Sequence, residues 1–184
     1  MANICLTKLT CVGEQEKLNN LLGMLSQGGR FHEIPLSEII DRCGIEVKDF
    51  KGSLRGDFTL VSADSHDIRF YTTTAWQAPY EVMQLLKDKF GVDIYYSAEE
   101  PGNCVYETND KDHTYFPPFF AEIHSDREDI DSDRIFAYSE KQLLEEIENA
   151  TDVKLSSLEE LQEHDFGDGV EVNAGKYEIT DFLL

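Results

Sequence analysis

The switch from strand-like to helix-like spacing near the start of the chain is the feature that most constrains its fold. In the stretch "NICLTKLTCV", residues 3–12, side chains alternate so that positions 5, 7, 9 and 11 share one face, which is typical of a strand. Directly after it, residues 14–27 carry an apolar stripe at the spacing i, i+3, i+4 and i+7. The stripe consists of Leu18, Leu21, Leu22 and Leu25. A strand followed at once by a one-sided helix predicts a helix packed on a sheet.

The same two patterns then repeat. Residues 57–74 alternate on both sides of a polar turn and predict two strands joined as a hairpin. Residues 79–91 begin with a proline, end with a glycine and carry apolar side chains at helical spacing, so they predict a second helix. Residues 92–98 and 103–108 predict two more strands around a Pro-Gly turn.

The predicted order is βαββαβ with one added strand, which is the ferredoxin-like split βαβ plan. In this α+β sandwich, two helices pack on one face of an antiparallel sheet. We assign this core to residues 1–110.

An acidic C-terminal extension of helices and a hairpin is predicted for residues 111–184, packed on the core rather than independent. The stretch "YFPPFF", residues 115–120, is interpreted as an ordered loop or edge strand, because exposure of so many rings would be costly. Two short helices with serine caps are predicted at residues 139–150 and 156–164. A closing hairpin is predicted across residues 174–175.

The formal net charge of −21 is unevenly distributed. Residues 1–98 hold 13 acidic and 10 basic side chains, whereas residues 99–184 hold 24 acidic and 6 basic ones. A field of this sign repels nucleic-acid phosphates and anionic membrane headgroups and attracts basic proteins. We therefore predict a basic protein surface as the partner, without direct nucleic-acid binding and without membrane binding.

The spacing of cysteines and histidines indicates neither a cofactor nor a metal. The four cysteines form no CxxC pair, and the five histidines form no HxH or HxxxH pair. We predict no cofactor and no catalytic residue, and we expect buried thiols in a reducing compartment. The N-terminus lacks the basic start and apolar run of a secretory signal, and no stretch approaches a membrane span. These features predict a cytoplasmic protein.

Several motifs resemble the YubB-type ferredoxin-like family of plasmid and phage proteins. The opening "MANICLTKLTCVG" is similar to that family's first strand, and "FYTTTAWQAPYEVMQLLKDKFG" resembles its strand, Thr-x-Trp-x-x-Pro motif and helix. The stretch "YYSAEEPGNCVYE" resembles its next strand, acidic-glycine turn and strand. The resemblance covers residues 1–108. It implies the ferredoxin-like architecture and a mobile-element setting, and it implies no activity.

A small cleft is predicted where a strand meets the second helix. Trp76 and Pro79 lie at this junction, and Tyr95, Glu99 and Glu100 follow on the next strand and turn. In the functional interpretation, aromatic rings flank a ligand and carboxylates fix its polar end, as in a small hydrolase or transferase. In the structural interpretation, the indole anchors the helix to the sheet and the proline sets its first turn.

The stretch "DIDSDRIFAYSE", residues 129–140, has the acidic spacing of an EF-hand calcium loop. The candidate metal ligands are Asp129, Asp131, Asp133 and Glu140. The sixth position, however, holds Arg134 instead of the glycine that allows the sharp turn. The alternative to a calcium loop is an acidic loop that leads to a helix capped by Ser139.

Dense negative faces are predicted on the two acidic helices. Carboxylates three or four residues apart on a helix lie about 5–6 Å from one another, a spacing that imitates a row of phosphates. The predicted interaction surface consists of Asp129, Asp131, Asp133, Glu145, Glu146, Glu148, Glu159, Glu160 and Glu163. We predict a non-enzymatic interaction protein of mobile-element type, with a phosphate-mimicking surface for a basic host protein. A solvated, solubilising face is the alternative.

Overall fold

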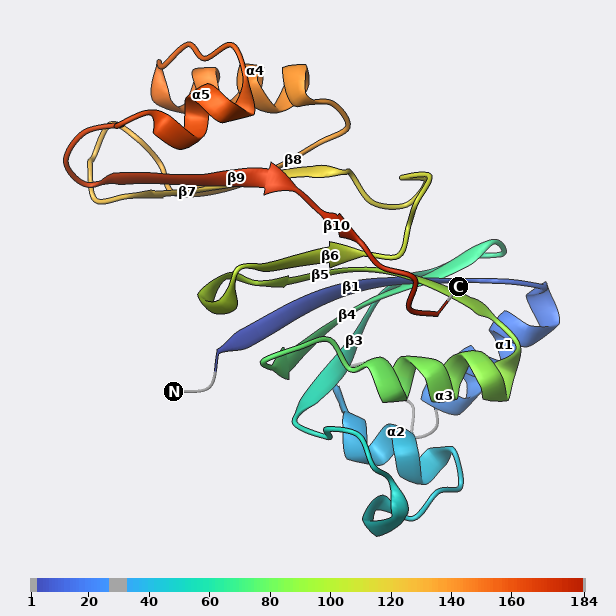
Figure 1. Cartoon of the computed structure of the whole chain (residues 1–184). Helices are drawn as coiled ribbons and strands as arrows, with labels where there is room; N and C mark the ends of the chain where they lie inside the picture. Colours follow the sequence, from blue (N-terminus) through green and yellow to red (C-terminus); the bar gives the residue numbers. More distant parts are fainter. Residues whose placement is uncertain (1–2, 27–32, 184) are drawn as a thin grey trace. The chain divides into compact units, whose positions relative to one another are not determined.

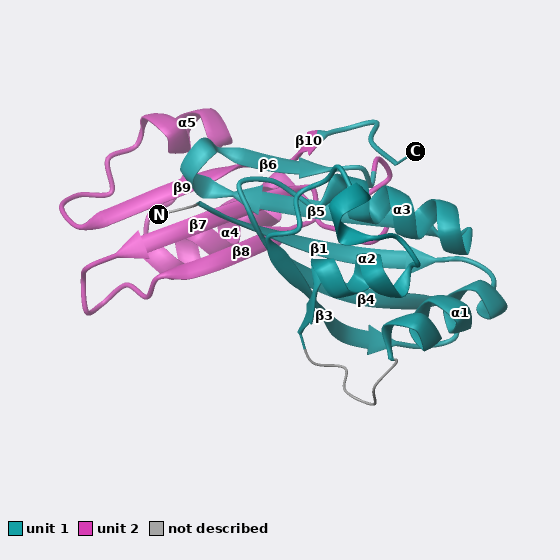
Figure 2. Cartoon of the chain, turned by 90° about the horizontal axis from the view of Figure 1, so that it is seen from below, with its two compact units in different colours: residues 1–110, 179–184 teal, residues 111–178 magenta. Residues whose placement is uncertain are grey.

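The computed structural model describes residues 3–26 and 33–183. Within these ranges the protein has an α+β fold with a seven-stranded mixed sheet, a three-stranded antiparallel sheet and five α-helices, so the predicted α+β class is confirmed. The chain divides into two compact units, which Figure 2 draws in different colours. Unit 1 contains residues 1–110 and 179–184, and unit 2 contains residues 111–178.

The larger sheet and three α-helices form unit 1 (Figure 1). The strands are β1 (Ile4–Val12), β2 (Ile34–Pro35), β3 (Gly56–Ala63), β4 (Asp67–Ala75), β5 (Asp93–Glu100), β6 (Val105–Thr108) and β10 (Glu178–Ile179). The helices are α1 (Gln15–Leu25), α2 (Leu36–Arg42) and α3 (Tyr80–Phe90), with the short 3₁₀ turns η1 (Val47–Asp49) and η2 (Pro101–Asn103). The strand β10 lies at the boundary of the two units.

The strand order of the larger sheet is β10-β6-β5-β1-β4-β3-β2. Strand β1 pairs antiparallel with both β4 and β5, so that Leu9 lies opposite Phe70 on one side and Tyr96 on the other. Helices α1, α2 and α3 lie on one face of this sheet (Figure 1). Leu9, Phe70 and Tyr96 are buried with the apolar faces of these helices, and this layer forms the core of unit 1.

The local signals predicted for the two longer helices of unit 1 are confirmed. In α1 the leucine stripe is buried, with Leu18, Leu21 and Leu25 at most 1% exposed. Helix α3 ends at Gly91, whose φ of +64° is a left-handed conformation that glycine adopts without steric cost. These helices therefore form where the sequence pattern predicts them, because apolar spacing and end residues agree.

The sheet of unit 1 is wider than predicted. We expected an antiparallel sheet with two helices, whereas β2 and β10 extend it, α2 adds a third helix, and the complete sheet is mixed. Strands β2 and β10 span two residues each, which is too short for an alternating pattern to be visible in the sequence. None of the helices in residues 3–26 and 33–183 is long and apolar enough to cross a membrane.

The C-terminal residues 179–183 return to unit 1 beside β6. The Thr180 N–H donates a hydrogen bond to the Thr108 carbonyl at 2.9 Å, and the Asn109 side-chain amide donates one to the Phe182 carbonyl at 3.2 Å. The chain therefore leaves unit 1 after β6 and comes back next to the same strand. Unit 2 is an insertion between two neighbouring segments, and the predicted extension does not include these last residues.

Unit 2 is a second, smaller sheet with two helices on one face (Figure 1). Its elements are β7 (Phe119–Ser125), β8 (Asp133–Ala137), α4 (Glu140–Thr151), α5 (Leu158–Glu163) and β9 (Val170–Lys176). The strand order is β8-β7-β9, with both pairs antiparallel. The core of unit 2 lies between sheet and helices, where Ile123, Leu143 and Ile147 are at most 1% exposed.

Two predicted details of this region differ in the structure. In the stretch "YFPPFF", residues 115–118 form a loop as predicted, but residues 119–120 begin β7, which is the central strand of its sheet and not an edge. Pro117 and Pro118 precede the strand, so the absence of their backbone N–H groups removes no hydrogen bond between strands. The hairpin across Ala174 and Gly175 is absent among the described residues, because β9 runs through both positions while it pairs with β7.

Candidate acidic interaction surface

The turn that joins β4 to α3 displays Trp76. Its backbone is held in place, because the Trp76 N–H donates to the Asn3 carbonyl at 3.0 Å and Thr74 Oγ1 donates to the Gln77 carbonyl at 2.6 Å. The φ of Trp76 is +77°, a region that costs a bulky L-residue about 1–2 kcal/mol. The indole is nevertheless 48% exposed. The side chain is therefore presented to solvent from a strained backbone. The interpretation of the indole as a buried anchor between helix and sheet does not fit this exposure.

The sheet separates the other residues of the predicted cleft. Successive side chains of a strand point to opposite faces, so Glu99 and Glu100 lie on opposite sides of β5. Tyr95 shares the face of Glu99 but lies four residues, or roughly 13 Å, further along the strand. Pro79 is buried at the N-cap of α3, one position before the first helical residue. The structure therefore does not bring these residues and Trp76 together into one cleft.

Both glutamates at the end of β5 have structural partners. The Glu99 carboxylate is 3% exposed and forms an ion pair with Lys8 of β1 at 3.7 Å. The Glu100 carboxylate is 1% exposed and accepts hydrogen bonds from the N–H groups of Gly102, at 3.0 Å, and Asn103, at 2.8 Å. Buried carboxylates need such partners, and here they stabilise the sheet and the turn after it.

A partly buried polar cluster ties α3 to β6. Both Tyr80 and Tyr96 donate hydrogen bonds to the Glu107 carboxylate, the second at 3.2 Å. Burial raises the pKa of each tyrosine hydroxyl, and the neighbouring Glu107 carboxylate raises it further. The hydroxyls therefore stay protonated and keep donating at neutral pH. Burial also raises the pKa of the Cys5 thiol on the same face of the sheet, which makes it a poor nucleophile.

The acidic helices of unit 2 begin at the predicted caps. Ser139 Oγ accepts the Gln142 N–H of α4 at 3.2 Å, and Ser157 Oγ accepts the Glu160 N–H of α5 at 3.2 Å. Both caps are therefore confirmed. They satisfy amide groups that have no partner within the helix, and they fix where each acidic face begins.

Part of the predicted acidic surface is used within unit 2. Glu145 forms an ion pair with Lys141 one turn earlier, at 3.1 Å. The Glu160 carboxylate accepts the Ser156 hydroxyl and, at 2.7 Å, its N–H, and these bonds lower the pKa of Glu160. These carboxylates have contacts within their own helix or at its start and are less available to a partner.

Other predicted acids of unit 2 remain available. In the described ranges, the following have no ion pair: Asp131, Glu146, Glu148, Glu159 and Glu163. Glu148 is half-buried and the others are exposed. We call the four on α4 and α5 the helix carboxylates, and they are Glu146, Glu148, Glu159 and Glu163.

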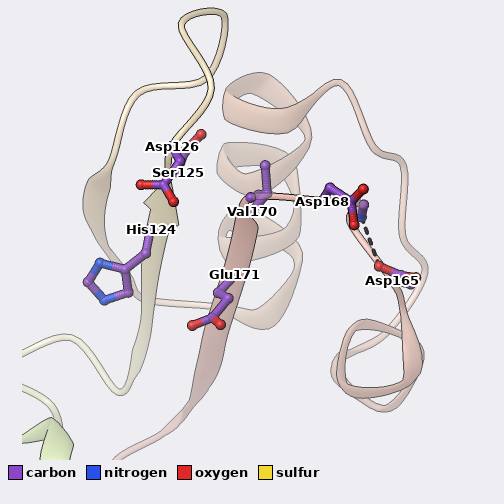
Figure 3. Close-up of a pocket in the computed structure, with 9 residues that line it drawn as sticks. His124, Ser125, Asp126, Asp165, Asp168, Val170 and Glu171 are labelled. Atoms are coloured by element: carbon purple, nitrogen blue, oxygen red, sulfur yellow. Dashed lines mark hydrogen bonds between the residues drawn. The ribbon is translucent and has the colours of Figure 1, made fainter.

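An open hollow of about 400 Å³ lies at one end of unit 2, where β7 and β9 meet the α5–β9 loop (Figure 3). Four carboxylates line it, and its lining contains no lysine or arginine. They are Asp126, Asp165, Asp168 and Glu171, which we call the hollow carboxylates. Among the described residues, none of the four forms an ion pair. The hollow is therefore a second acidic area on the same unit.

Backbone contacts between two loops shape the hollow. The Asp126 N–H, just after β7, donates to the Gly169 carbonyl at 2.8 Å, and the Gly167 N–H donates to the Asp165 carboxylate at 2.9 Å (Figure 3). His124 and Glu171 are direct cross-strand neighbours in β7 and β9. Sequence reasoning missed this group because its members come from segments about 40 positions apart, which only the β7–β9 pairing brings together.

The stretch that resembles a calcium loop is a turn followed by a strand. Asp129 pairs with Arg127 through two bonds of 2.9 and 2.5 Å, which lower the pKa of the carboxyl group. Asp133 begins β8, and Glu140 follows the far end of that strand, where it accepts a backbone N–H of α5 at 3.0 Å. The described residues contain no group of three or more metal-ligand side chains that could hold an ion. The calcium-loop interpretation is therefore overturned, because an extended strand separates its ligands.

Comparisons of the chain with protein-family models, curated proteins and solved structures gave no match. No relative therefore supplies a mechanism or a partner. What the molecule can bind follows from the charge and geometry of the described residues.

Proposed function

We propose that the protein is a non-enzymatic interaction protein whose unit 2 binds a basic protein surface. Unit 2 holds 19 acidic and 6 basic side chains, a net charge of −13 over 68 residues. A field of this strength repels phosphates and attracts surfaces rich in lysine and arginine. The observation that carries the proposal is the set of helix and hollow carboxylates, which have no ion pair among the described residues.

The partner we propose is a protein that binds nucleic-acid phosphates. Glu159 and Glu163 lie one turn apart on α5, a spacing of about 5–6 Å that resembles a row of phosphates. The serine caps fix the ends of both helices, so the carboxylates are arranged before binding. A groove that accepts a nucleic-acid backbone would accept this face by charge complementarity.

For unit 1 we propose the ferredoxin-like plan and kinship with the YubB-type family of plasmid and phage proteins. The strand order β5-β1-β4-β3, with α1 after β1 and α3 after β4, supports that plan. The Thr-x-Trp-x-x-Pro motif supports the kinship, and in this chain it forms the turn at Trp76. In this proposal unit 1 is the scaffold and unit 2 is the inserted binding region.

The proposal is tested by calorimetric binding to protamine, an arginine-rich DNA-binding protein, with duplex DNA as a competitor. We expect saturable binding that duplex DNA displaces. Salt screens surface charges. The affinity should therefore fall by about tenfold or more as the salt concentration rises from about 0.05 to about 0.5 M. Absent binding, or an affinity insensitive to salt, contradicts the proposal.

A matched pair of variants locates the binding surface. In the first variant, the four helix carboxylates are changed to glutamine, which removes four charges and keeps the shape. In the second, four exposed acids of unit 1 are changed to amides: Glu16, Asp41, Asp49 and Asp88. At about 0.2–1 kcal/mol per exposed charge pair, the first variant should bind at least about fourfold more weakly. Equal weakening by both variants would indicate a diffuse field and no binding surface on unit 2.

A further inference from the structure

The exposed tryptophan of unit 1 combines two features that local packing does not explain. The Trp76 backbone lies in a left-handed region that a glycine would occupy without strain. Its indole is 48% exposed, and Ile4, paired with Ala75 on the neighbouring strand, is 62% exposed. A strained backbone that displays a large aromatic ring is typical of a residue kept for contact with another molecule.

The turn also holds the backbone of Trp76 in a defined place. Its backbone is bonded to Asn3 on one side, and Thr74 closes it onto Gln77 on the other. Ala78 and Pro79, which follow, are buried at the start of α3. The ring is therefore presented from a fixed backbone, and binding to it would require little ordering.

We propose that Trp76 is the anchor for a basic segment of a protein partner, with an arginine or lysine side chain stacked on the indole face. Tryptophan is the strongest aromatic acceptor of such cation–π contacts. The net charge of −8 on unit 1 and of −21 on the chain favours a cationic occupant over a neutral or anionic one. The site lies on unit 1 and rests on conformation and exposure, so it is independent of the acidic surface proposed for unit 2.

The test uses the full chain and its own fluorescence, because Trp76 is the single tryptophan of the sequence. The probe is a hexa-arginine peptide, and its matched control is hexa-citrulline, which has nearly the same shape without the charge. We expect a saturable change of tryptophan emission with hexa-arginine and none with hexa-citrulline. The response should persist when the four helix carboxylates are changed to glutamine, since those groups belong to unit 2.

Substitutions at Trp76 then test whether binding depends on an aromatic face or only on apolar surface area. In the background with neutral helix carboxylates, Trp76→Leu should weaken calorimetric binding of hexa-arginine by about two- to thirty-fold, the range of a cation–π contact. Trp76→Phe keeps an aromatic face and should recover part of the loss. The circular dichroism spectrum of each variant checks the fold, and the emission experiment on the unaltered chain needs no variant.

Three results would overturn the proposal. In the emission experiment, they are no change of tryptophan emission with hexa-arginine, or the same change with hexa-citrulline. In calorimetry, it is the same affinity for hexa-arginine in the Trp76→Leu variant and in the protein from which it was made. Protamine binding that is lost on neutralising the helix carboxylates, with no emission response, leaves the acidic surface as the only binding region. An emission response without any effect of the helix carboxylates removes the function proposed for unit 2 and keeps the Trp76 anchor.

Discussion

The two units use the same construction and differ in the density of their acidic side chains. Each packs helices on one face of a sheet, and each has its own apolar cluster. Unit 1 carries a net charge of −8 over 116 residues, whereas unit 2 carries −13 over 68. Most acids are exposed in both units, but unit 1 buries Asp67, Glu99, Glu100 and Asp110, whereas the buried acid of unit 2 is Glu122. Buried carboxylates stabilise their own fold, and exposed ones remain available to a partner.

Buried polar groups have partners in both units. The Asn109 side chain in unit 1 accepts the Tyr96 N–H at 2.8 Å and donates to the Ile94 carbonyl at 2.8 Å, so it replaces backbone pairing at the end of β6. Unit 2 also buries one acid in this way, because Glu122 is bonded to Arg134 of the adjacent strand at 2.8 Å. The units therefore differ in surface charge. In both of them, the buried charges have partners.

A pair of core substitutions should separate the stabilities of the two units. Leu21 in unit 1 and Leu143 in unit 2 are both fully buried, so each change to alanine should destabilise its own unit by about 3–4 kcal/mol. Chemical denaturation followed by tryptophan emission reports on unit 1 alone, because Trp76 lies there. Leu21→Ala should move this transition, and Leu143→Ala should move only a component seen by far-ultraviolet circular dichroism. An equal shift of the emission transition by both variants would mean that the chain unfolds as one unit.

Unit 1 should also be the more sensitive unit to alkali. Burial raises the pKa of the Cys11 thiol from 9.0 to about 12. The thiol stays neutral in the folded chain and ionises near pH 9 in the unfolded chain, so its contribution is constant below pH 9 and is lost as pH rises toward 12. The loss is about 1.4 kcal/mol per pH unit, or about 3 kcal/mol between about pH 9 and pH 11. Denaturation followed by Trp76 emission over this range measures it.

Matched cysteine variants assign this pH dependence. Cys11→Ala should flatten the alkaline slope of the emission-detected stability. Cys104→Ala changes an exposed thiol and should leave the slope as it is in the unaltered chain. Identical slopes in all three proteins would show that the buried thiol does not set the sensitivity.

The smallest effect we predict concerns a helix cap of unit 2. Ser139→Ala removes the oxygen that accepts the Gln142 N–H and should destabilise unit 2 by about 1 kcal/mol. Ser139→Asp keeps an accepting oxygen at the helix N-terminus and should retain most of that stability. Thermal unfolding followed by circular dichroism measures both variants. An equal loss in the two would show that the hydroxyl acts through packing and does not act as a cap.

Local patterns predicted the elements whose signals lie within a few residues. The leucine stripe of α1, the glycine at the end of α3 and the cap at Ser139 each have a complete physical cause in neighbouring positions. The same reasoning succeeded only in part at "YFPPFF", where aromatic residues and prolines suggested a loop or edge. Residues 115–118 form a loop, but pairing with β8 and β9 on both sides makes the last two residues the start of a central strand, and those partners lie elsewhere in the chain.

The candidate sites divide in the same way. Composition alone located the acidity in the C-terminal half, because charge is a property of the residues and needs no fold. The sequence pattern ended this strand at residue 98, whereas β5 continues to Glu100, so that alternation places Glu99 and Glu100 on opposite faces of the sheet. Ion pairs such as Lys141–Glu145 follow from helical spacing, whereas the contact of Glu140 with the start of α5 depends on the fold.

The sequence by itself determined the helices α1, α3, α4 and α5, the α+β class and the sign of the chain's own net charge. Only the tertiary structure decided that the last residues return beside β6, that four carboxylates from two distant segments share one hollow, and that Trp76 is exposed on a strained turn. The reason is physical. Helix periodicity and charge are local or additive, whereas strand partners, burial and exposure depend on residues far apart in the chain.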